Sequence, residues 1–442
     1  MSTRQPPLPD RFRLSNGLRV LVAPDHLSSV VSVAVCYDVG YRSEPEGREG
    51  FAHLFEHMMF QGSENFPKLA HGRMINACGG TFNGTTHRDH TCYHQVLPAR
   101  SLEIALRLEA DRMRAPLLDA DALANQVAVV EQEIRRKVLD NPYGGLPSPY
   151  LQAVMFDDPA NSHDGWGAVE RLGTVTVDEC RTFFDEYYCP TNALLVVCGD
   201  ASPELVRELA ERHFGAIPSG IAPAGPAAAP APTRDERHRT HFRPAVAVRA
   251  MAAGWRLPDP SRDLAGFEAA VLLTELLSYR SDSVLQERLV RKDGAVQQLS
   301  MTAGLNGVPF GSRDPDVLAL IMLLNAEAAQ EAVLDAVYEE FERIACDGPS
   351  AELLARRAAT WRTTWMSSLD SLSTRARTLG AFELLHGDAE LVWELPDRIR
   401  EVTADAVAGA AARLAEQPRR WVAVLPGADE RSGAELVKQA VA

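Results

Sequence analysis

Long hydrophobic runs are absent from this chain of 442 residues. Its apolar stretches, such as Val30 to Cys36, are far too short to cross a bilayer, since a membrane-spanning helix needs about 20 apolar residues. The first seven residues, Met1 to Pro7, have no apolar core of the kind that a secretory signal carries. The sequence therefore predicts a cytoplasmic protein with no membrane partner.

Basic residues are too few for a nucleic-acid-binding protein. The chain has 45 lysines and arginines against 60 acidic residues, and its net charge at pH 7 is −15. Contacts with phosphates need a basic face, so we expect no nucleic-acid partner. An acidic excess of this size is typical of a solvated surface.

Paired cysteines and a phosphate-binding loop are absent as well. The seven cysteines are odd in number and no two have the C-x-x-C spacing, which predicts buried free thiols in a reducing compartment. No glycine-rich loop leads into a helix that begins with lysine, which argues against a nucleotide-binding fold. The 46% of hydrophobic residues suffice for a large core, so a metal ion would be catalytic rather than structural.

The most informative segment is His53-Leu54-Phe55-Glu56-His57, within an apolar stretch that we expect to form a buried helix. Residues four apart share one helix face. His53 and His57 can therefore reach one metal ion, with Glu56 beside them. Two neutral nitrogen ligands and a carboxylate that takes a proton from bound water are what a zinc hydrolase needs. The H-x-x-E-H order is also a zinc-peptidase motif.

A catalytic zinc site needs a third protein ligand, and the segment 125–134 offers candidates. Glu131 and Glu133 cannot both face the metal, because two residues span about 200° around a helix. Glu133 lies next to the apolar stripe of this segment and on the face of Gln126, so we choose it, although spacing alone leaves Glu131 open. The stripe consists of Leu123, Val127, Val130, Ile134 and Val138.

A stretch rich in proline and alanine, Pro218 to Pro232, has the composition of a linker. It predicts an N-terminal catalytic zinc domain at 1–217, a linker at 218–235 and a C-terminal inactive homologous domain at 236–442. Strands and helices alternate in both halves, while the second half lacks the H-x-x-E-H motif. We therefore predict an α+β fold of two similar domains, each a mostly antiparallel sheet packed with helices.

The expected elements follow from periodicity and from β-branched runs. In the first half they are strands at 18–23, 30–37, 81–86, 91–97 and 193–198, and helices at 101–113, 119–139 and 180–188. In the second half they are strands at 246–255 and 318–324, an amphipathic helix at 264–277, and long helices at 328–344 and 351–368.

Further segments complete a family pattern around the motif: residues 37–47, 50–60, 79–86, 89–93, 108–113 and 188–193. Glu133 follows His57 by 76 positions (133 − 57). Together these segments resemble the pitrilysin/insulinase superfamily of inverzincin metallopeptidases, in particular short bacterial members related to mitochondrial processing peptidase. The resemblance covers most of the first half, and the second half is similar in outline.

The resemblance implies one zinc ion per chain, held by His53, His57 and Glu133, with Glu56 as the general base. It also implies that four such domains, two of them from this chain, form a clamshell around a chamber. There the enzyme would act as a zinc-dependent endopeptidase on short or unfolded peptides. A peptide would add to the edge strand at 81–86, which makes these residues substrate-binding: Phe82, Asn83, Gly84 and Thr85.

Two departures from the family pattern matter. Active relatives carry an arginine and a tyrosine seven residues apart in a second-half domain, and the corresponding positions here hold Val290 and Gln297. Arg288 and Arg291 are alternatives for the arginine. Some short bacterial members divide the work between subunits, so we expect a heterodimer with a homologous subunit that lacks the zinc motif and supplies the pair. The second departure is Gln126, where many relatives have a glutamate.

Three expectations remain open at this stage. A non-catalytic peptide-binding or scaffold subunit is one alternative function, which the intact motif disfavours. A self-sufficient homodimeric peptidase is another, which the missing arginine and tyrosine disfavour. Carboxylates are also expected to orient the two histidines, and Asp89 and Asp111 are the candidates.

Overall fold

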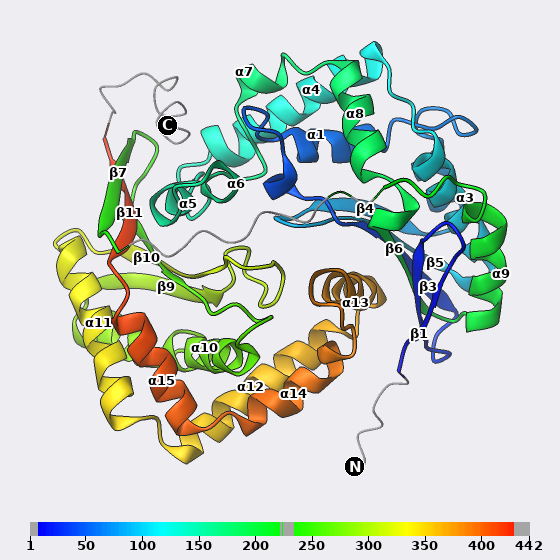
Figure 1. Ribbon diagram of the computed structural model, residues 1–442. Helices are drawn as coiled ribbons and strands as arrows, with labels where there is room; N and C mark the ends of the chain where they lie inside the picture. Colours follow the sequence, from blue (N-terminus) through cyan, green and yellow to red (C-terminus); the bar gives the residue numbers. More distant parts are fainter. Residues whose placement is uncertain (1–7, 222, 224–233, 428–442) are drawn as a thin grey trace. The chain divides into compact units, whose positions relative to one another are not determined.

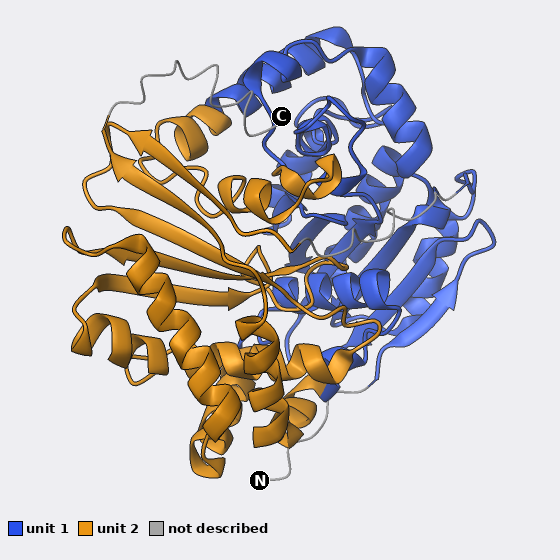
Figure 2. Cartoon of the chain, turned by 60° about the vertical axis from the view of Figure 1, so that its left-hand side comes forward, with its two compact units in different colours: residues 1–132, 165–227, 366–394 blue, residues 133–164, 228–365, 395–442 orange. Residues whose placement is uncertain are grey.

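A computed structural model describes residues 8–221, 223 and 234–427 of the chain (Figure 1). The chain divides into two compact units that are built from interleaved stretches of sequence (Figure 2). Unit 1 comprises residues 1–132, 165–227 and 366–394, and unit 2 comprises residues 133–164, 228–365 and 395–442. Each unit has one sheet and packed helices, which confirms the predicted α+β class.

The sheet of unit 1 has six strands in the order β1-β2-β6-β3-β5-β4. Strands β2 and β6 are parallel, and the other neighbours are antiparallel. The central strand β3 is almost wholly buried because its β-branched residues meet apolar side chains on both faces. The strands are β1 (Asp10–Arg13), β2 (Arg19–Pro24), β3 (Val30–Tyr37), β4 (Thr81–Thr86), β5 (Thr91–Pro98) and β6 (Ala193–Gly199).

Helix α13 (Leu372–His386) packs on β3 and β6, although it comes from the second half of the sequence. A glycine makes this approach close, because a Cβ atom on Gly380 would lie 2.8 Å from Cys36 Sγ. The ion pair between Arg375 and Asp25, at 2.7 Å, also ties the helix to unit 1. The other helices of unit 1 are α1 (Phe51–Met58), α2 (Ala70–Ala77), α3 (Leu102–Arg114), α4 (Ala120–Ile134), α7 (Val169–Leu172), α8 (Val177–Tyr187) and α9 (Pro203–Phe214).

The sheet of unit 2 has five strands in the order β7-β11-β8-β10-β9. Strands β7 and β11 pair in parallel, as β2 and β6 do in unit 1, and the remaining neighbours are antiparallel. The similarity of the two halves, which the sequence predicted, is therefore a similarity of strand order: β7-β11-β8-β10-β9 corresponds to β2-β6-β3-β5-β4. The strands are β7 (Arg237–Arg243), β8 (Ala250–Arg256), β9 (Val296–Ala303), β10 (Val317–Leu324) and β11 (Arg420–Pro426).

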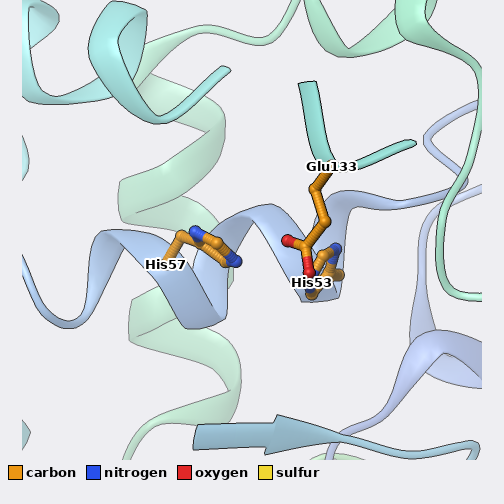
Figure 3. Close-up of side chains that lie close together, drawn as sticks. All are labelled: His53, His57 and Glu133. Atoms are coloured by element: carbon orange, nitrogen blue, oxygen red, sulfur yellow. The ribbon is translucent and has the colours of Figure 1, made fainter. Parts of the chain in front are cut away.

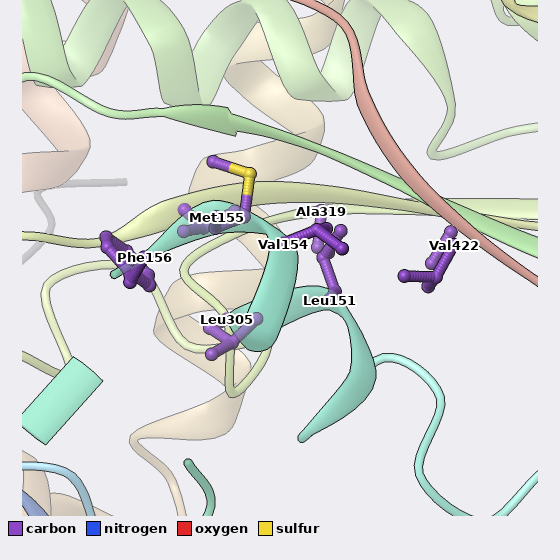
Figure 4. Close-up of a cluster of buried hydrophobic side chains, with 9 residues drawn as sticks. Leu151, Val154, Met155, Phe156, Leu305, Ala319 and Val422 are labelled. Carbon is purple, nitrogen blue, oxygen red and sulfur yellow. The ribbon is translucent and has the colours of Figure 1, made fainter. Parts of the chain in front are cut away.

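Helix α5 (Tyr150–Met155) lies against the sheet of unit 2, although it comes from the first half of the sequence. Its apolar side chains Leu151, Val154 and Met155 join a buried cluster with Val317, Ala319 and Val422 from the strands (Figure 4). The other helices of unit 2 are α6 (Pro159–Ser162), α10 (Leu264–Leu277), α11 (Gln330–Asp347), α12 (Ala351–Ser368), α14 (Leu391–Glu401) and α15 (Ala404–Ala415). Unit boundaries fall inside α4, α12 and α14.

Most predicted elements are present within a few residues of their expected ends. The strands at 30–37 and 81–86 and the helices at 264–277 and 351–368 agree with the predicted ranges. The prediction that 264–277 is amphipathic was wrong, since α10 is buried around nearly its whole circumference. Of the predicted linker at 218–235, residues 222 and 224–233 lie outside the described residues.

Candidate metal centre

Helix α1 carries the H-x-x-E-H motif and is fixed on both sides. Its apolar face packs Phe51 and Phe55 against Phe183, with ring centroids 4.9 and 5.3 Å apart. Its first turn is capped by Glu44, whose carboxylate accepts hydrogen bonds from Gly50 N at 2.9 Å and Ala52 N at 2.7 Å. An acceptor with a negative charge is favourable at a helix N-terminus. The opposite face of the helix therefore presents its two histidines in a fixed position.

The structure brings His53, His57 and Glu133 together (Figure 3). One ligand atom from each lies within 4.8 Å of the others, and all three residues are half-buried. In the described part of the chain this is the one group of three or more metal-ligating side chains with such proximity. Two imidazoles and a carboxylate are the protein donor set of a catalytic zinc site, so the residues present fit a zinc ion.

Helix α4 presents Glu133, and not Glu131, to the two histidines. The stripe predicted for this helix is buried at Leu123, Val130 and Ile134, and it turns the neighbouring Glu133 inward. After Ile134 the chain continues as a π-helical turn, Arg135–Leu139. From this turn Lys137 reaches back to Glu133 Oε1 at 2.6 Å.

Gln126 lies one helical repeat before Glu133 and contacts the nearer histidine. Its Oε1 accepts a hydrogen bond from His57 Nδ1 at 3.3 Å, and the residue is 6% exposed. The contact leaves Nε2 of His57 as the nitrogen for a metal. On the other histidine, the rings of His53 and Trp166 stack edge to face at 4.8 Å. Trp166 was not among the predicted site residues, because it lies outside the motif segments.

The carboxylates predicted to orient the histidines are engaged elsewhere. Asp111 accepts hydrogen bonds from Ser63 and Asn65, at 2.6 and 2.7 Å, and pairs with Arg114. Asp89 forms a buried ion pair with Arg42 at 2.9 Å. The prediction for Asp111 was wrong because loop residues in front of α2 take up both of its oxygens, and it is Gln126 that contacts His57.

Glu56 lies beneath β4 and is held by that strand. Its Oε2 accepts a hydrogen bond from Thr86 Oγ1 at 2.5 Å. Gly84 permits the approach, because a Cβ atom there would lie 2.6 Å from Glu56 Oε1. Below the carboxylate, burial raises the pKa of Tyr93 and of Tyr188, so both phenols are neutral at physiological pH. Glu56 itself is buried, so its carboxylate is held by the hydroxyl group of Thr86 rather than by bulk solvent.

The predicted substrate-binding residues all lie in β4, at the edge of its sheet. Asn83 is exposed, while Phe82 packs against Phe60 and His71 with ring centroids 5.5 and 5.6 Å apart. Thr85 Oγ1 donates to the carbonyl of Cys92 on β5 at 3.5 Å. Burial lowers the pKa of His71 to about 3, and Arg112 adds to that effect, so the imidazole beside Phe82 is neutral at physiological pH.

The candidate positions for the arginine and tyrosine pair lie in unit 2. Arg288 pairs with Asp293 and Glu339, both at 2.8 Å, and Arg291 pairs with Glu287 at 3.0 Å. Gln297 is exposed in β9, which is an edge strand of its sheet. Both arginines therefore serve local ion pairs on and near the second π-helical segment, Gln286–Lys292.

The fold and the site together define a class: an α+β protein of two similar sheets in which a motif helix carries two of the three donor side chains that fit a zinc ion. Residues 19–144 match the family model described as "Insulinase (Peptidase family M16)", and residues 174–360 match that of the "Peptidase M16 inactive domain". The chain belongs to the insulinase family of peptidases, family M16.

Named relatives agree with this assignment. The zinc protease PqqE of Helicobacter pylori is 28% identical over 354 residues, which cover 74% of this chain and 77% of that protein. The beta subunit of the mitochondrial-processing peptidase of Blastocladiella emersonii is 22% identical over 89% of this chain and 83% of its own length.

Solved structures have the same fold. A protease from Helicobacter pylori superposes with a TM-score of 0.86 at 23% identity, covering 95% of this chain and 100% of that one. Pitrilysin superposes with a TM-score of 0.76 at 19% identity, over 98% of this chain but 47% of pitrilysin. This chain therefore spans about half the length of pitrilysin. None of the helices in the described part has the length and apolar character needed to span a bilayer.

Proposed function

We propose that this protein is a zinc-dependent endopeptidase subunit that hydrolyses short or unfolded peptides. One observation carries the proposal: three donor side chains from two segments of the chain lie within 4.8 Å of one another. In this proposal His53, His57 and Glu133 hold one zinc ion per chain. The zinc proteases among the relatives support the choice of metal.

Glu56 is proposed as the general base. A bound zinc ion would supply Lewis acidity and lower the pKa of a water molecule to about 7. Glu56 takes the proton from the attacking water and then transfers it to the leaving amine of the peptide. Thr86 holds one oxygen of the carboxylate at 2.5 Å, which fixes the direction in which Glu56 accepts and returns that proton.

The substrate is proposed to bind as an added strand along β4. Within the described residues β4 pairs with β5 on one side, so its outer edge offers backbone donors and acceptors to an extended peptide. Backbone hydrogen bonds of this kind give affinity with little sequence preference. Phe82, Asn83, Gly84 and Thr85 would line this strand, with Glu56 directly below Gly84.

A partner subunit is part of the proposal. We place the catalytic half at 1–217 and the inactive homologous half at 236–442, which together form half of a four-domain clamshell around a chamber. The paired side chains of Arg288 and Arg291 support the view that this chain lacks its own arginine and tyrosine pair. A homologous subunit without the zinc motif would supply that pair. The free cysteines support a cytoplasmic location.

The test of the zinc and base assignments compares single variants by metal analysis and peptide cleavage. Glu56→Gln is expected to retain zinc and to lose cleavage by at least about a thousandfold, whereas Glu133→Gln should lose most of its zinc. Glu131→Gln is the matched control and should retain both properties. Retained turnover in Glu56→Gln, or unchanged zinc in Glu133→Gln, would contradict the assignments.

The partner is tested by measuring cleavage of a quenched peptide with this chain alone and with a co-expressed homologous subunit. The proposal expects turnover of the mixture and almost none of the single chain. Turnover by this chain alone would favour the self-sufficient homodimer. A zinc-loaded mixture that binds peptide without cleaving it would favour the scaffold subunit.

A further inference from the structure

A cavity of about 550 Å³ lies within unit 2, away from the residues of the metal centre. It is lined by the end of β8, helices α10 and α15 and the first residue of β11, and it is partly open to solvent. Its volume is that of a typical small-molecule site. We propose that this cavity binds a small organic anion, with a carboxylate or phosphate group on an apolar body. This inference is independent of the proposed peptidase activity.

The inner walls of the cavity are apolar and buried. They are formed by Met155, Leu257, Ala270, Ala410 and Leu414, each at most 4% exposed. Met155 also belongs to the hydrophobic cluster on the sheet of unit 2 (Figure 4). An apolar group of a ligand would replace water along these walls, and that burial stabilises the complex by about 25 cal/mol for each Å² removed from water.

The frame of the cavity is held by side-chain hydrogen bonds. Gln417 spans the end of β8, because its Oε1 accepts from Arg256 N at 2.7 Å and its Nε2 donates to Arg256 O at 2.9 Å. The carbonyl of Gln417 accepts in turn from Tyr338 Oη at 3.0 Å. Arg420 Nη1 donates to the carbonyl of Met155 at 2.6 Å. The cavity is therefore formed before a ligand arrives, which lowers the entropy lost on binding.

The polar lining carries an excess of positive charge. Four arginines face two acidic residues, a balance of +2 (4 − 2) in a chain whose net charge is −15. One acid, Asp263, is occupied as the cap of α10, where it accepts from Gly266 N at 2.8 Å. The arginines are Arg234, Arg256, Arg413 and Arg420, and the second acid is Glu416.

Two of these arginines, Arg256 and Arg420, repel each other. Burial lowers the pKa of Arg420, and the charges of Arg237 and Arg256 lower it further, against an opposite effect of Asp157 and Asp235. A bound anion would relieve this repulsion. The guanidinium fork also matches the geometry of carboxylate and phosphate oxygens. Arg256 also meets Asp314 at 3.5 Å.

The first experiment uses isothermal titration calorimetry on the full-length chain with hexanoate, hexyl phosphate and the neutral control hexanol. The anions should bind with one site per chain and hexanol at least about tenfold more weakly. Because anions also bind zinc, the titration is repeated with His57→Ala, which lacks one proposed ligand, and the affinity should be unchanged. Equal affinity for hexanol, loss of binding in His57→Ala, or no binding of either anion would overturn the proposal.

The second experiment tests whether the anion binds in the cavity. Arg413→Gln removes an exposed charge at the mouth, and Arg256→Lys keeps the charge but loses the fork. Each is expected to weaken anion binding about tenfold, while the exposed Arg262→Gln, outside the cavity, should leave it unchanged. Unaltered anion affinity in both cavity variants would show that the anion does not bind in this cavity. Circular dichroism spectra that match the parent chain confirm that each variant is folded.

Discussion

At the scale of single residues, the contact between Gln126 and His57 is the feature that a motif search does not reveal. A metal-binding histidine is oriented by the group that accepts from its second nitrogen. In this chain that group is a neutral amide in place of the carboxylate expected from the family pattern. Its Oε1 lies 3.3 Å from His57 Nδ1, and it fixes the ring without adding a negative charge next to the donor set.

Gln126→Leu should lower zinc affinity by about 10- to 100-fold, because the ring of His57 loses its acceptor. Competition with a chelator measures this change without relying on activity. Gln126→Glu should restore or exceed the parent affinity. The exposed Gln132→Leu on the same helix is the control. An unchanged zinc affinity in Gln126→Leu would mean that the amide does not position His57.

Glu275 offers a test of stability against pH. Burial raises its pKa from 4.5 to about 7, although Arg357 and Arg280 act in the opposite direction. Its Oε2 is buried and has no hydrogen-bond partner among the described residues. The folded state therefore binds this proton more tightly than the unfolded state, and the stability contributed by the group is lost as pH rises from about 4.5 to 7.

Glu275→Gln should accordingly stabilise the protein at pH 8, by on the order of 1–2 kcal/mol after allowance for solvent screening. At pH 5 the difference should nearly vanish. Thermal unfolding followed at both pH values measures it, with the exposed Glu342→Gln as the control. A gain of equal size at both pH values would contradict the assigned linkage.

At the scale of elements, helix α1 depends on a cap supplied from outside the helix. With eight residues it is too short to be stable by itself. Glu44 accepts from the backbone at both Gly50 and Ala52, so it satisfies two donors of the first turn. The side chain of Glu44, six residues before Gly50, therefore defines where the helix with both histidines begins.

Glu44→Ala should cost about 1–2 kcal/mol of stability and reduce zinc content at limiting metal, since the motif helix loses its start. Differential scanning calorimetry and metal analysis give the two readouts. Glu44→Gln retains one acceptor and should lie between the parent and the alanine variant. Glu46→Ala, at an exposed neighbouring position, should behave like the parent. Equal stability of Glu44→Ala and Glu46→Ala would refute the capping role.

At the scale of the whole molecule, the two units exchange segments of sequence. Unit 1 takes residues 366–394 from the second half, and unit 2 takes residues 133–164 from the first. Helix α13 buries Ala376, Leu379 and Phe382 at no more than 1% exposure. A chain that ended near residue 217 would leave the face of β3 and β6 beneath this helix open to water.

The fragment 1–217 expressed alone should therefore fail to show a cooperative thermal transition and should bind a hydrophobic dye. Co-expression with the fragment 236–442 should restore both the transition and the zinc content of the full chain. A cooperative transition of fragment 1–217 alone, at the temperature of the full protein, would show that α13 is dispensable for unit 1.

The sequence by itself determined most of the local structure and the types of donor side chain at the candidate metal centre. The spacing of His53, Glu56 and His57 determines a shared helix face, and the stripe on α4 predicted that Glu133 rather than Glu131 turns inward, because helical periodicity depends only on neighbouring residues. Most strands and helices were predicted for the same reason. The strand β7 (Arg237–Arg243) was not predicted, because its sequence is polar. It forms a strand because it pairs with β11.

Only the tertiary structure decided which distant segments meet. The proximity of Glu133 to the histidines, the contact of Gln126 with His57, the cap from Glu44 and the cover of unit 1 by α13 all join residues that local periodicity does not relate. Such contacts form because each apolar face has to be buried against some other element. Which element covers a given apolar face depends on the packing of all the elements together, and local sequence does not determine it.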